Sequence, residues 1–168
     1  TFARFMANTG IAVVGHSHLG HGKSVAAEKD IGFISDRDGW ELAVRDTHLL
    51  WEKTHDKYPG LPYFLLGHSM GSFLARTFLI RYHNILAGCI ISGTGQQAFA
   101  LLIAGLAAAG AERLLFGPRH QSARLNYLCF GAYNRRIPNH RTPSDWLTRD
   151  HDVVEKYMAD AVCGFVPS

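Results

Sequence analysis

Short hydrophobic runs alternate with amphipathic segments along the first half of the chain. The runs at residues 11–14, 63–66 and 86–92 are almost wholly apolar, which is typical of strands buried on both faces of a parallel sheet. Between them, apolar positions recur at helical spacing and predict helices over residues 38–58 and 70–82. Because strands and helices alternate with short turns, the pattern predicts the α/β fold class with central parallel strands.

Local signals mark where these helices begin and end. Phe2 and Phe5 stand at helical spacing and Gly10 occupies the position of a left-handed stop, so the chain opens on the last turns of a helix. Asp38 followed by Glu41 is a capping-box pattern, which predicts the start of the next helix. A chain that opens on the end of a helix is expected to be an internal piece of a longer one, incomplete at both ends.

The second half of the chain has a different pattern. Residues 96–160 contain helical stretches interrupted at Gly117 and Pro138, and no run there predicts a strand. We therefore expect two parts: a partial α/β core at residues 1–95 and a helical cap insertion at residues 96–168.

The longest uncharged apolar stretch lies in this second half, at residues 98–111. A helix that crosses a bilayer needs about 20 apolar residues, and this stretch is shorter. It predicts a buried or interfacial helix instead of a membrane span.

Composition narrows the class of protein. Hydrophobic residues make up 47%, and 17 Lys+Arg against 14 Asp+Glu give a formal net charge of +3. This apolar content excludes a disordered chain, and the small charge surplus excludes a strongly basic nucleic-acid-binding protein. Cys89, Cys129 and Cys163 form no C-x-x-C pair, so we expect reduced thiols and no disulfide framework or metal site. The predicted location is the cytoplasm.

The clearest chemical signal is the G-x-S-x-G motif Gly67-His68-Ser69-Met70-Gly71, which stands between a predicted strand and a predicted helix. This is the place of a nucleophile elbow, a turn so tight that its serine is strained and a side chain at either glycine would collide with backbone. Ser69 is the predicted nucleophile, and the backbone N–H of Met70 is the predicted oxyanion donor. His68 is interpreted as an elbow residue pointing toward the core. The competing interpretation of Ser69 is a simple helix N-cap.

Three segments carry a family resemblance: residues 20–24 (GHGKS), 63–72 and 91–95. Together they resemble the monoacylglycerol lipase and lysophospholipase-like branch of the α/β-hydrolases, also called serine aminopeptidase-like hydrolases. The resemblance implies an eight-stranded fold with a helical cap over residues 96–160, and no cofactor. It also implies a triad in the order Ser, Asp, His, whose Asp and His are not in this chain, and a second oxyanion donor before residue 1. One departure is Ser17, where the family usually has an acidic residue.

The run Asp150-His151-Asp152 offers an acid and a base in the right order after Ser69. It falls within a helical pattern over residues 146–158. Adjacent helical residues point about 100° apart, which is a poor arrangement for an aspartate to orient its neighbouring histidine. We therefore interpret this run as part of a solvated cap helix.

A metal site is the second chemical alternative. The spacing of His16, His18 and His21 resembles the metal loop of metallo-β-lactamase-fold hydrolases, and three imidazoles could hold zinc. Gly20 stands where that loop needs an aspartate, and no second set of ligands is evident. We favour a polar turn near the site, without a metal.

The predicted cap is apolar enough to cover an acyl chain. Eight large apolar residues provide this surface, or else pack the cap against the core: Phe99, Leu101, Leu102, Ile103, Leu106, Leu114, Leu115 and Phe116. Six arginines either meet anionic head groups or keep the cap solvated: Arg113, Arg119, Arg124, Arg135, Arg136 and Arg141.

We therefore expect a serine hydrolase that cleaves carboxylic esters of hydrophobic acyl substrates, of the lysophospholipid or monoacylglycerol type, through an acyl-enzyme at Ser69. The expected partner is a small hydrophobic ester or lipid, with peripheral membrane contact and no nucleic acid. Other interpretations stay open: a fragment inactive in isolation, a non-catalytic α/β-hydrolase relative, and peptide, thioester or acyl-transfer chemistry.

Overall fold

The computed structural model describes residues 2–25 and 27–168. The chain divides into two compact units. The core unit consists of Thr1–His18 and Arg37–Gln96, and the helical unit consists of Leu19–Asp36 and Gln97–Ser168. The segment 19–36 therefore belongs with the helices of the second half, whereas the sequence pattern grouped it with the core.

The core unit contains a parallel pair of strands, β1 (Phe64–His68) and β2 (Gly88–Ser92). Their register runs from Phe64 opposite Gly88 to His68 opposite Ser92. The two predicted strands are confirmed, although β1 continues through Gly67 to His68 and β2 begins at Gly88. Strand β1 extends past the apolar run because the ladder pairs Gly67 with Ile91.

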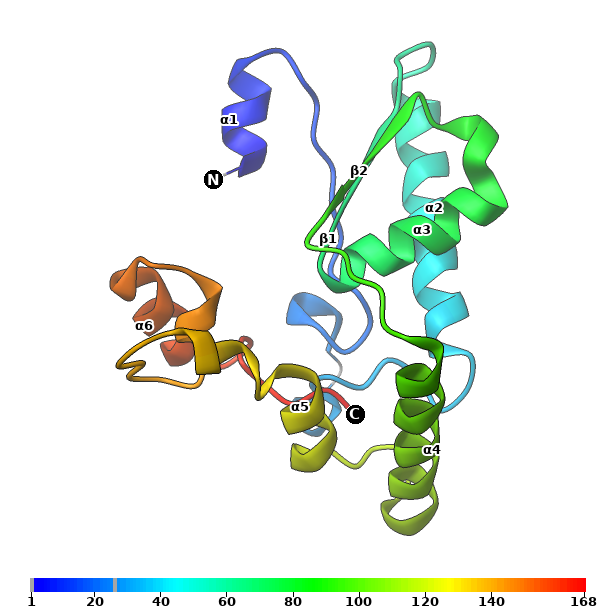
Figure 1. Ribbon diagram of the computed structural model, residues 1–168. Helices are drawn as coiled ribbons and strands as arrows, with labels where there is room; N and C mark the ends of the chain where they lie inside the picture. Colours follow the sequence, from blue (N-terminus) through cyan, green and yellow to red (C-terminus); the bar gives the residue numbers. More distant parts are fainter. Residues whose placement is uncertain (1, 26) are drawn as a thin grey trace. The chain divides into compact units, whose positions relative to one another are not determined.

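Two helices cover this pair on one side, as Figure 1 shows: α2 (Gly39–Lys57) and α3 (Met70–Tyr82). Helix α3 packs on the strands, and α2 packs on α3. Their shared apolar core is built from Ala43 and Val44 of α2 with Leu74 and Phe78 of α3. Trp40 Nε1–H at the start of α2 also donates to Thr77 Oγ1 of α3, at 3.1 Å. The strand–helix–strand arrangement thus positions the turn between β1 and α3.

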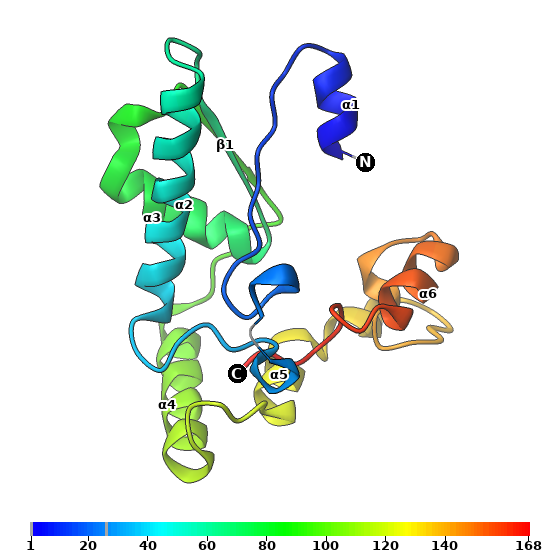
Figure 2. The same ribbon diagram turned by 180° about the vertical axis from the view of Figure 1, so that it is seen from behind.

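The predicted strand at residues 11–14 does not form. Residues 11–18 lie in no helix or strand, and Ile11 and Val14 are 48% and 42% exposed. Both views show this segment passing beside β1 (Figures 1 and 2). A strand is defined by hydrogen bonds to a neighbour, and in the described part of the chain only β1 and β2 form a ladder. The apolar pattern of residues 11–14 indicated only that the side chains are hydrophobic. Forming a strand also requires a hydrogen-bonded neighbour, which the pattern cannot reveal.

Helix boundaries confirm one predicted signal and correct another. Helix α1 (Phe2–Asn8) is followed by Gly10 with φ 83°, the predicted left-handed stop. The capping box at Asp38 is absent, because Asp38 has φ 53° and its side chain caps no amide, whereas a capping residue needs extended backbone. Glu41 instead forms an ion pair with Arg81 of α3, which lowers the pKa of the Glu41 carboxyl.

In its described residues the helical unit contains three α-helices, α4 (Phe99–Phe116), α5 (Ala123–Phe130) and α6 (His151–Ala159). The same residues include four short 3₁₀ segments: η1 (Gly22–Ser24), η2 (Glu28–Asp30), η4 (Tyr133–Arg136) and η5 (Asp145–Leu147). In the core unit, η3 (His83–Ile85) follows α3. No strand occurs among the described residues of the helical unit, as predicted.

The helix predicted over residues 146–158 is in fact two elements. Segment η5 ends at Leu147, and α6 begins only at His151. The break has a local cause, because the Asp150 side chain accepts hydrogen bonds from the amides of Asp152 and Val153 and so starts a new helix.

Helix α4 is longer than the 14-residue apolar run suggested. It continues past the charged pair Glu112 and Arg113 to Phe116, giving 18 residues with a mean hydropathy of 1.7, none of them buried. By length and composition alone it meets the criterion for a membrane span, a criterion that core helices and signal sequences also meet.

Candidate active site

Ser69 forms the corner between the last residue of β1 and the first residue of α3. Its backbone angles are φ 53° and ψ −120°. Among the described residues only Asp38 and Asn139 share a positive φ without being glycine. Such a conformation costs about 1–3 kcal/mol and persists only where the surroundings fix it. The strained serine predicted from the motif is therefore present, and its side chain is exposed.

The two glycines of the motif have different roles. A Cβ on Gly67 would lie 2.2 Å from the carbonyl oxygen of Gly71 and 2.9 Å from the Ala75 Cβ, so a side chain is excluded there. A Cβ on Gly71 would meet nothing within 4 Å in the described chain. The predicted collision is thus correct at Gly67 and wrong at Gly71, because the close approach involves the backbone of Gly71 and the direction in which its own Cβ would point is open.

Both backbone polar groups of Ser69 are used in holding the turn. Its N–H donates to the carbonyl oxygen of Ser92 at 3.0 Å. Its carbonyl oxygen accepts from the Ser72 N–H at 2.8 Å and from the Ser72 hydroxyl at 2.6 Å. Ser72 itself is fully buried, so both bonds come from a donor residue enclosed by the packing of α3. The turn is consequently anchored to β2 on one side and to the first turn of α3 on the other.

Met70 is the first residue of α3. The first amides of an α-helix have no acceptor within the helix, and they lie at the positive end of its dipole. The Met70 N–H follows the Ser69 side chain directly, which is the arrangement an oxyanion donor requires. Its predicted role is compatible with this position.

His68 does not point toward the core. It is exposed, and its Nδ1 lies 3.1 Å from the hydroxyl oxygen of Ser92. The two residues face each other as the last pair of the strand ladder, which the sequence pattern could not reveal. The correction has a geometric cause: Gly67, its neighbour in the strand, takes the buried side.

No imidazole or carboxylate within the described residues hydrogen-bonds to the Ser69 hydroxyl. The Asp150 carboxylate, the acid considered above, is engaged in capping α6, because its Oδ1 accepts from Asp152 N at 3.0 Å and from Val153 N at 3.3 Å. A carboxylate used as a helix cap supports its interpretation as a structural residue of the helical unit.

The described residues gather no three His, Cys, Asp or Glu side chains that could hold a metal ion. The rings of His16 and His18 meet edge to face with centroids 4.7 Å apart. His21 has its Nδ1 2.9 Å from the Leu19 carbonyl oxygen and its ring beside Phe165. The zinc alternative therefore gains no support from this geometry.

Two of the three cysteines, Cys89 and Cys163, are poor competing nucleophiles. All three are free, and burial raises the pKa of the Cys89 and Cys163 thiols. Because only the thiolate is strongly nucleophilic, a raised pKa keeps these two groups unreactive near neutral pH.

Most of the arginines considered for head-group binding have partners within the helical unit. Arg119 pairs with Asp30 at 2.5 Å and Asp36 at 3.5 Å, and it lies 4.1 Å from the centroid of the Phe33 ring. The remaining contacts join Arg113 to the Asp36 carbonyl, Arg124 to Glu112, Arg135 to the Tyr127 hydroxyl and Arg141 to Glu155. These contacts favour a structural role for the set.

The eight apolar residues singled out above are all exposed, from 50% at Leu102 to 87% at Leu114.

Comparison with known proteins identifies the family of this chain. The family model described as serine aminopeptidase, S33, matches residues 1–168. The chain belongs to this family. The resemblance to the monoglyceride-lipase-like branch of the α/β-hydrolases is thereby confirmed, and so is the α/β-hydrolase fold class.

Curated relatives of this S33 family chain include monoglyceride lipases. A monoglyceride lipase homolog of Monkeypox virus is 30% identical over 160 residues, covering 94% of this chain and 49% of the relative. The monoglyceride lipase of Homo sapiens is 40% identical over 73 residues, covering 44% of this chain and 22% of the relative. The mouse (Mus musculus) monoglyceride lipase is 27% identical over 161 residues, covering 94% and 45%.

A solved structure is also similar. A highly thermostable carboxyl esterase from Bacillus coagulans, crystallised in complex with glycerol, superposes with a TM-score of 0.78 at 28% identity, covering 90% of this chain and 48% of the esterase. The chain thus spans about half the length of the proteins that match it over most of its own length.

Proposed function

We propose that the protein containing this chain hydrolyses carboxylic esters through an acyl-enzyme on Ser69. The observation that carries the proposal is the strained, exposed Ser69 at the corner between β1 and α3, with φ 53° and with a glycine at position 67, where a Cβ would collide with the Gly71 carbonyl. A simple helix N-cap has extended backbone and accepts a hydrogen bond from the helix, whereas the Ser69 side chain caps no amide.

The chemistry follows from this position. The Ser69 oxygen attacks the ester carbonyl carbon while a general base takes its proton, and the negative charge that develops on the carbonyl oxygen is met by the Met70 N–H. Collapse of the tetrahedral intermediate expels the alcohol, which receives the proton. Water then repeats the sequence on the acyl-enzyme and releases the acid. We place the base and its carboxylate partner outside residues 1–168, as the family resemblance implies.

The proposed substrate is a hydrophobic ester of the monoacylglycerol or lysophospholipid type. Its support is the exposed apolar surface of α4 and the names of the relatives, among them monoglyceride lipases and a carboxyl esterase crystallised with glycerol. Helix α4 would serve as part of a cap that binds the acyl chain.

The proposal is tested by labelling with a fluorophosphonate probe, which phosphonylates activated serines. The probe is applied to the full reading frame that encodes residues 1–168, to Ser69→Ala, and to Ser144→Ala, a serine of the helical unit that serves as matched control. We expect equal labelling of the wild type and Ser144→Ala and none of Ser69→Ala. An unlabelled wild type, beside a known serine hydrolase that labels normally, would exclude the proposed function.

The substrate class needs a separate measurement. Hydrolysis of a monoacylglycerol, a lysophospholipid and p-nitrophenyl esters of increasing acyl length is compared at equal concentration. We expect kcat/KM to rise with acyl length and to favour one of the two lipids over acetate esters. A preference for acetate esters would contradict an acyl-binding role for the apolar helix.

A further inference from the structure

Two hydrogen bonds join the corner between β1 and α3 to a single residue of β2. The backbone N–H of Ser69 donates to the Ser92 carbonyl oxygen at 3.0 Å, and the His68 Nδ1 lies 3.1 Å from the Ser92 hydroxyl oxygen. Ser92 is the last residue of β2 and faces His68 in the strand register. The backbone bond that fixes Ser69 is therefore the final bond of the ladder, and the side-chain pair lies beside it.

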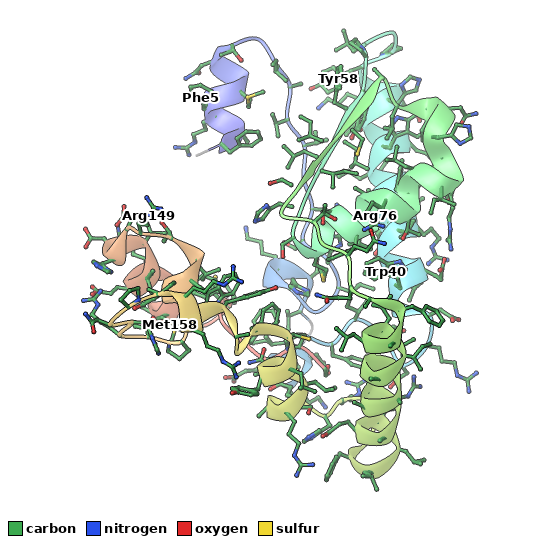
Figure 3. All side chains as sticks on the ribbon, in the orientation of Figure 1. Phe5, Trp40, Tyr58, Arg76, Arg149 and Met158 are labelled. Carbon is green, nitrogen blue, oxygen red and sulfur yellow. The ribbon has the colours of Figure 1, made fainter. Side chains whose placement is uncertain are left out.

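The residue after Ser92 packs against the same imidazole. Gly93 has φ 60°, and a Cβ there would lie 3.0 Å from Cε1 of His68 and 3.5 Å from the Ser69 amide nitrogen. Slightly further along, the Gly95 carbonyl accepts from the Arg76 guanidinium of α3 at 3.2 Å. The chain leaving β2 is thus held against both the His68 ring and the helix that Ser69 starts; Figure 3 labels Arg76 on α3.

We infer that His68 and Ser92 are positioning residues for the nucleophile, acting as a side-chain clamp that keeps the Ser69 backbone in its strained conformation. The inference rests on the proposed function of Ser69. A strained residue persists only where its neighbours fix it, and the last bond of a strand ladder frays unless something beyond the ladder holds it. The imidazole–hydroxyl bond supplies that support at the residue preceding Ser69.

The clamp assigns His68 a role different from that of a general base. Its Nδ1 is directed at Ser92, and no bond joins its ring to the Ser69 hydroxyl among the described residues. A positioning role requires only a polar atom at the place of Nδ1, whereas a base requires a group that gains and loses a proton near neutral pH. The variant His68→Asn keeps a polar atom at that place but cannot act as a base.

The test compares His68→Ala, His68→Asn, Ser92→Ala and the double alanine variant in the full reading frame, with Ser144→Ala as control. Three quantities are measured: the second-order rate of fluorophosphonate labelling, kcat and KM for p-nitrophenyl butyrate, and the Tm. We expect His68→Ala and Ser92→Ala each to lower the labelling rate and kcat roughly five- to tenfold, the fold-change that corresponds to one neutral hydrogen bond. KM and Tm should stay close to wild type.

Two comparisons separate the clamp from other roles. The double variant should be no slower than either single variant, because both remove the same bond, and His68→Asn should recover most of the lost rate. A His68→Asn variant as slow as His68→Ala, additive losses in the double variant, or wild-type rates in both single variants would each overturn the inference. Should His68→Ala fail to fold, Ser92→Ala and His68→Asn still decide the question.

The outcomes also distinguish a failure of the clamp from a failure of the proposed function of Ser69. If the wild type and Ser144→Ala are labelled and the clamp variants are labelled at the same rate, only the inference fails. If the wild type is not labelled at all, the proposed function fails and the inference fails with it.

Discussion

Five hydrophobic residues are buried in the core unit, whereas Val154 is the one such residue in the described part of the helical unit. In the core unit, Phe78 of α3 is buried in one cluster with Val44 of α2, and Leu65 of β1 packs against that cluster. The helical unit relies more on polar contacts, among them the Asp30–Arg119 ion pair and the bonds that Asp145 accepts. Its longest helix, α4, buries nothing. The α/β pattern thus builds a packed support for Ser69 from elements adjacent in sequence. The helical unit buries fewer hydrophobic side chains and combines polar contacts with aromatic ones, such as Phe130 stacked on Trp146.

Removing the central side chain of the core unit should have the largest effect. Phe78 is 1% exposed, and Phe78→Ala is expected to lower the free energy of unfolding by about 3–5 kcal/mol, from lost burial and the cavity left behind. Urea denaturation measures the change. Ile80→Ala is the control on the same helix, because Ile80 is 81% exposed and its loss should change stability by less than about 0.5 kcal/mol. Equal effects of the two variants would contradict the proposed packing.

The second-largest effect is expected from a substitution in the turn between β1 and α3. Gly67→Ala places a Cβ against the Gly71 carbonyl, and overpacking of this kind costs about 1–3 kcal/mol. Because relief requires the turn itself to move, fluorophosphonate labelling of Ser69 should also be lost. Gly71→Ala is the matched variant: its Cβ meets open space and alanine favours a helix, so labelling should persist. Loss of labelling in both variants would show that the two glycines are equivalent.

The third prediction concerns Asp145, whose contribution to the stability of the helical unit should depend on pH. The Thr142 hydroxyl, followed by the Arg141 backbone N–H, donates to the Asp145 carboxylate and lowers the pKa of Asp145. A carboxyl whose pKa is lower in the folded state stabilises fully above its unfolded value of about 3.9 and loses that contribution as the pH falls toward the folded value.

The measurement is urea unfolding between about pH 5 and about pH 2.5, a range that brackets the carboxyl titration. Unfolding is followed by Trp146 fluorescence after the protein's other tryptophans, among them Trp40 and Trp51, are replaced by phenylalanine. We expect the helical unit to weaken below about pH 4. Asp145→Asn should show less of this pH dependence, because it has no carboxyl at that position. An unchanged pH profile in Asp145→Asn would exclude Asp145 as its source.

The smallest effect is expected at an exposed ion pair. Arg119→Gln removes the contacts to Asp30 and Asp36, and an exposed pair contributes about 0.2–1 kcal/mol, less at high salt. Urea unfolding at low and high ionic strength measures it. Arg136→Gln is the control, since Arg136 forms no ion pair within the described residues. A salt-independent loss would indicate that packing on Phe33 outweighs the charge.

What the sequence could and could not predict follows from the range of the interactions involved. The strain at Ser69 and the need for Gly67 were predictable, because both arise within a few residues of the turn. The strand at residues 11–14 was not, because a strand needs a partner that the pattern of one segment does not contain. Asp38 and Glu41 looked like a capping box, but Glu41 finds Arg81 on another helix. The orientation of His68 depends on Ser92, which lies on another strand.

The contact between Gly67 and the Gly71 backbone also limits how the length of the chain can vary. The segment from the end of β1 to the first turn of α3 is held at both ends by hydrogen bonds, to Ser92 on one side and to Ser72 on the other. An added residue could not be accommodated there without breaking one of them. The turn at Pro59–Leu61 is exposed, and a Cβ on Gly60 would meet nothing within 4 Å. A library of single-codon insertions should therefore yield labelled protein when the insertion falls at Pro59–Leu61, and none when it falls between β1 and α3. The number of residues between β1 and α3 is then a stricter genetic constraint than the identity of most side chains there.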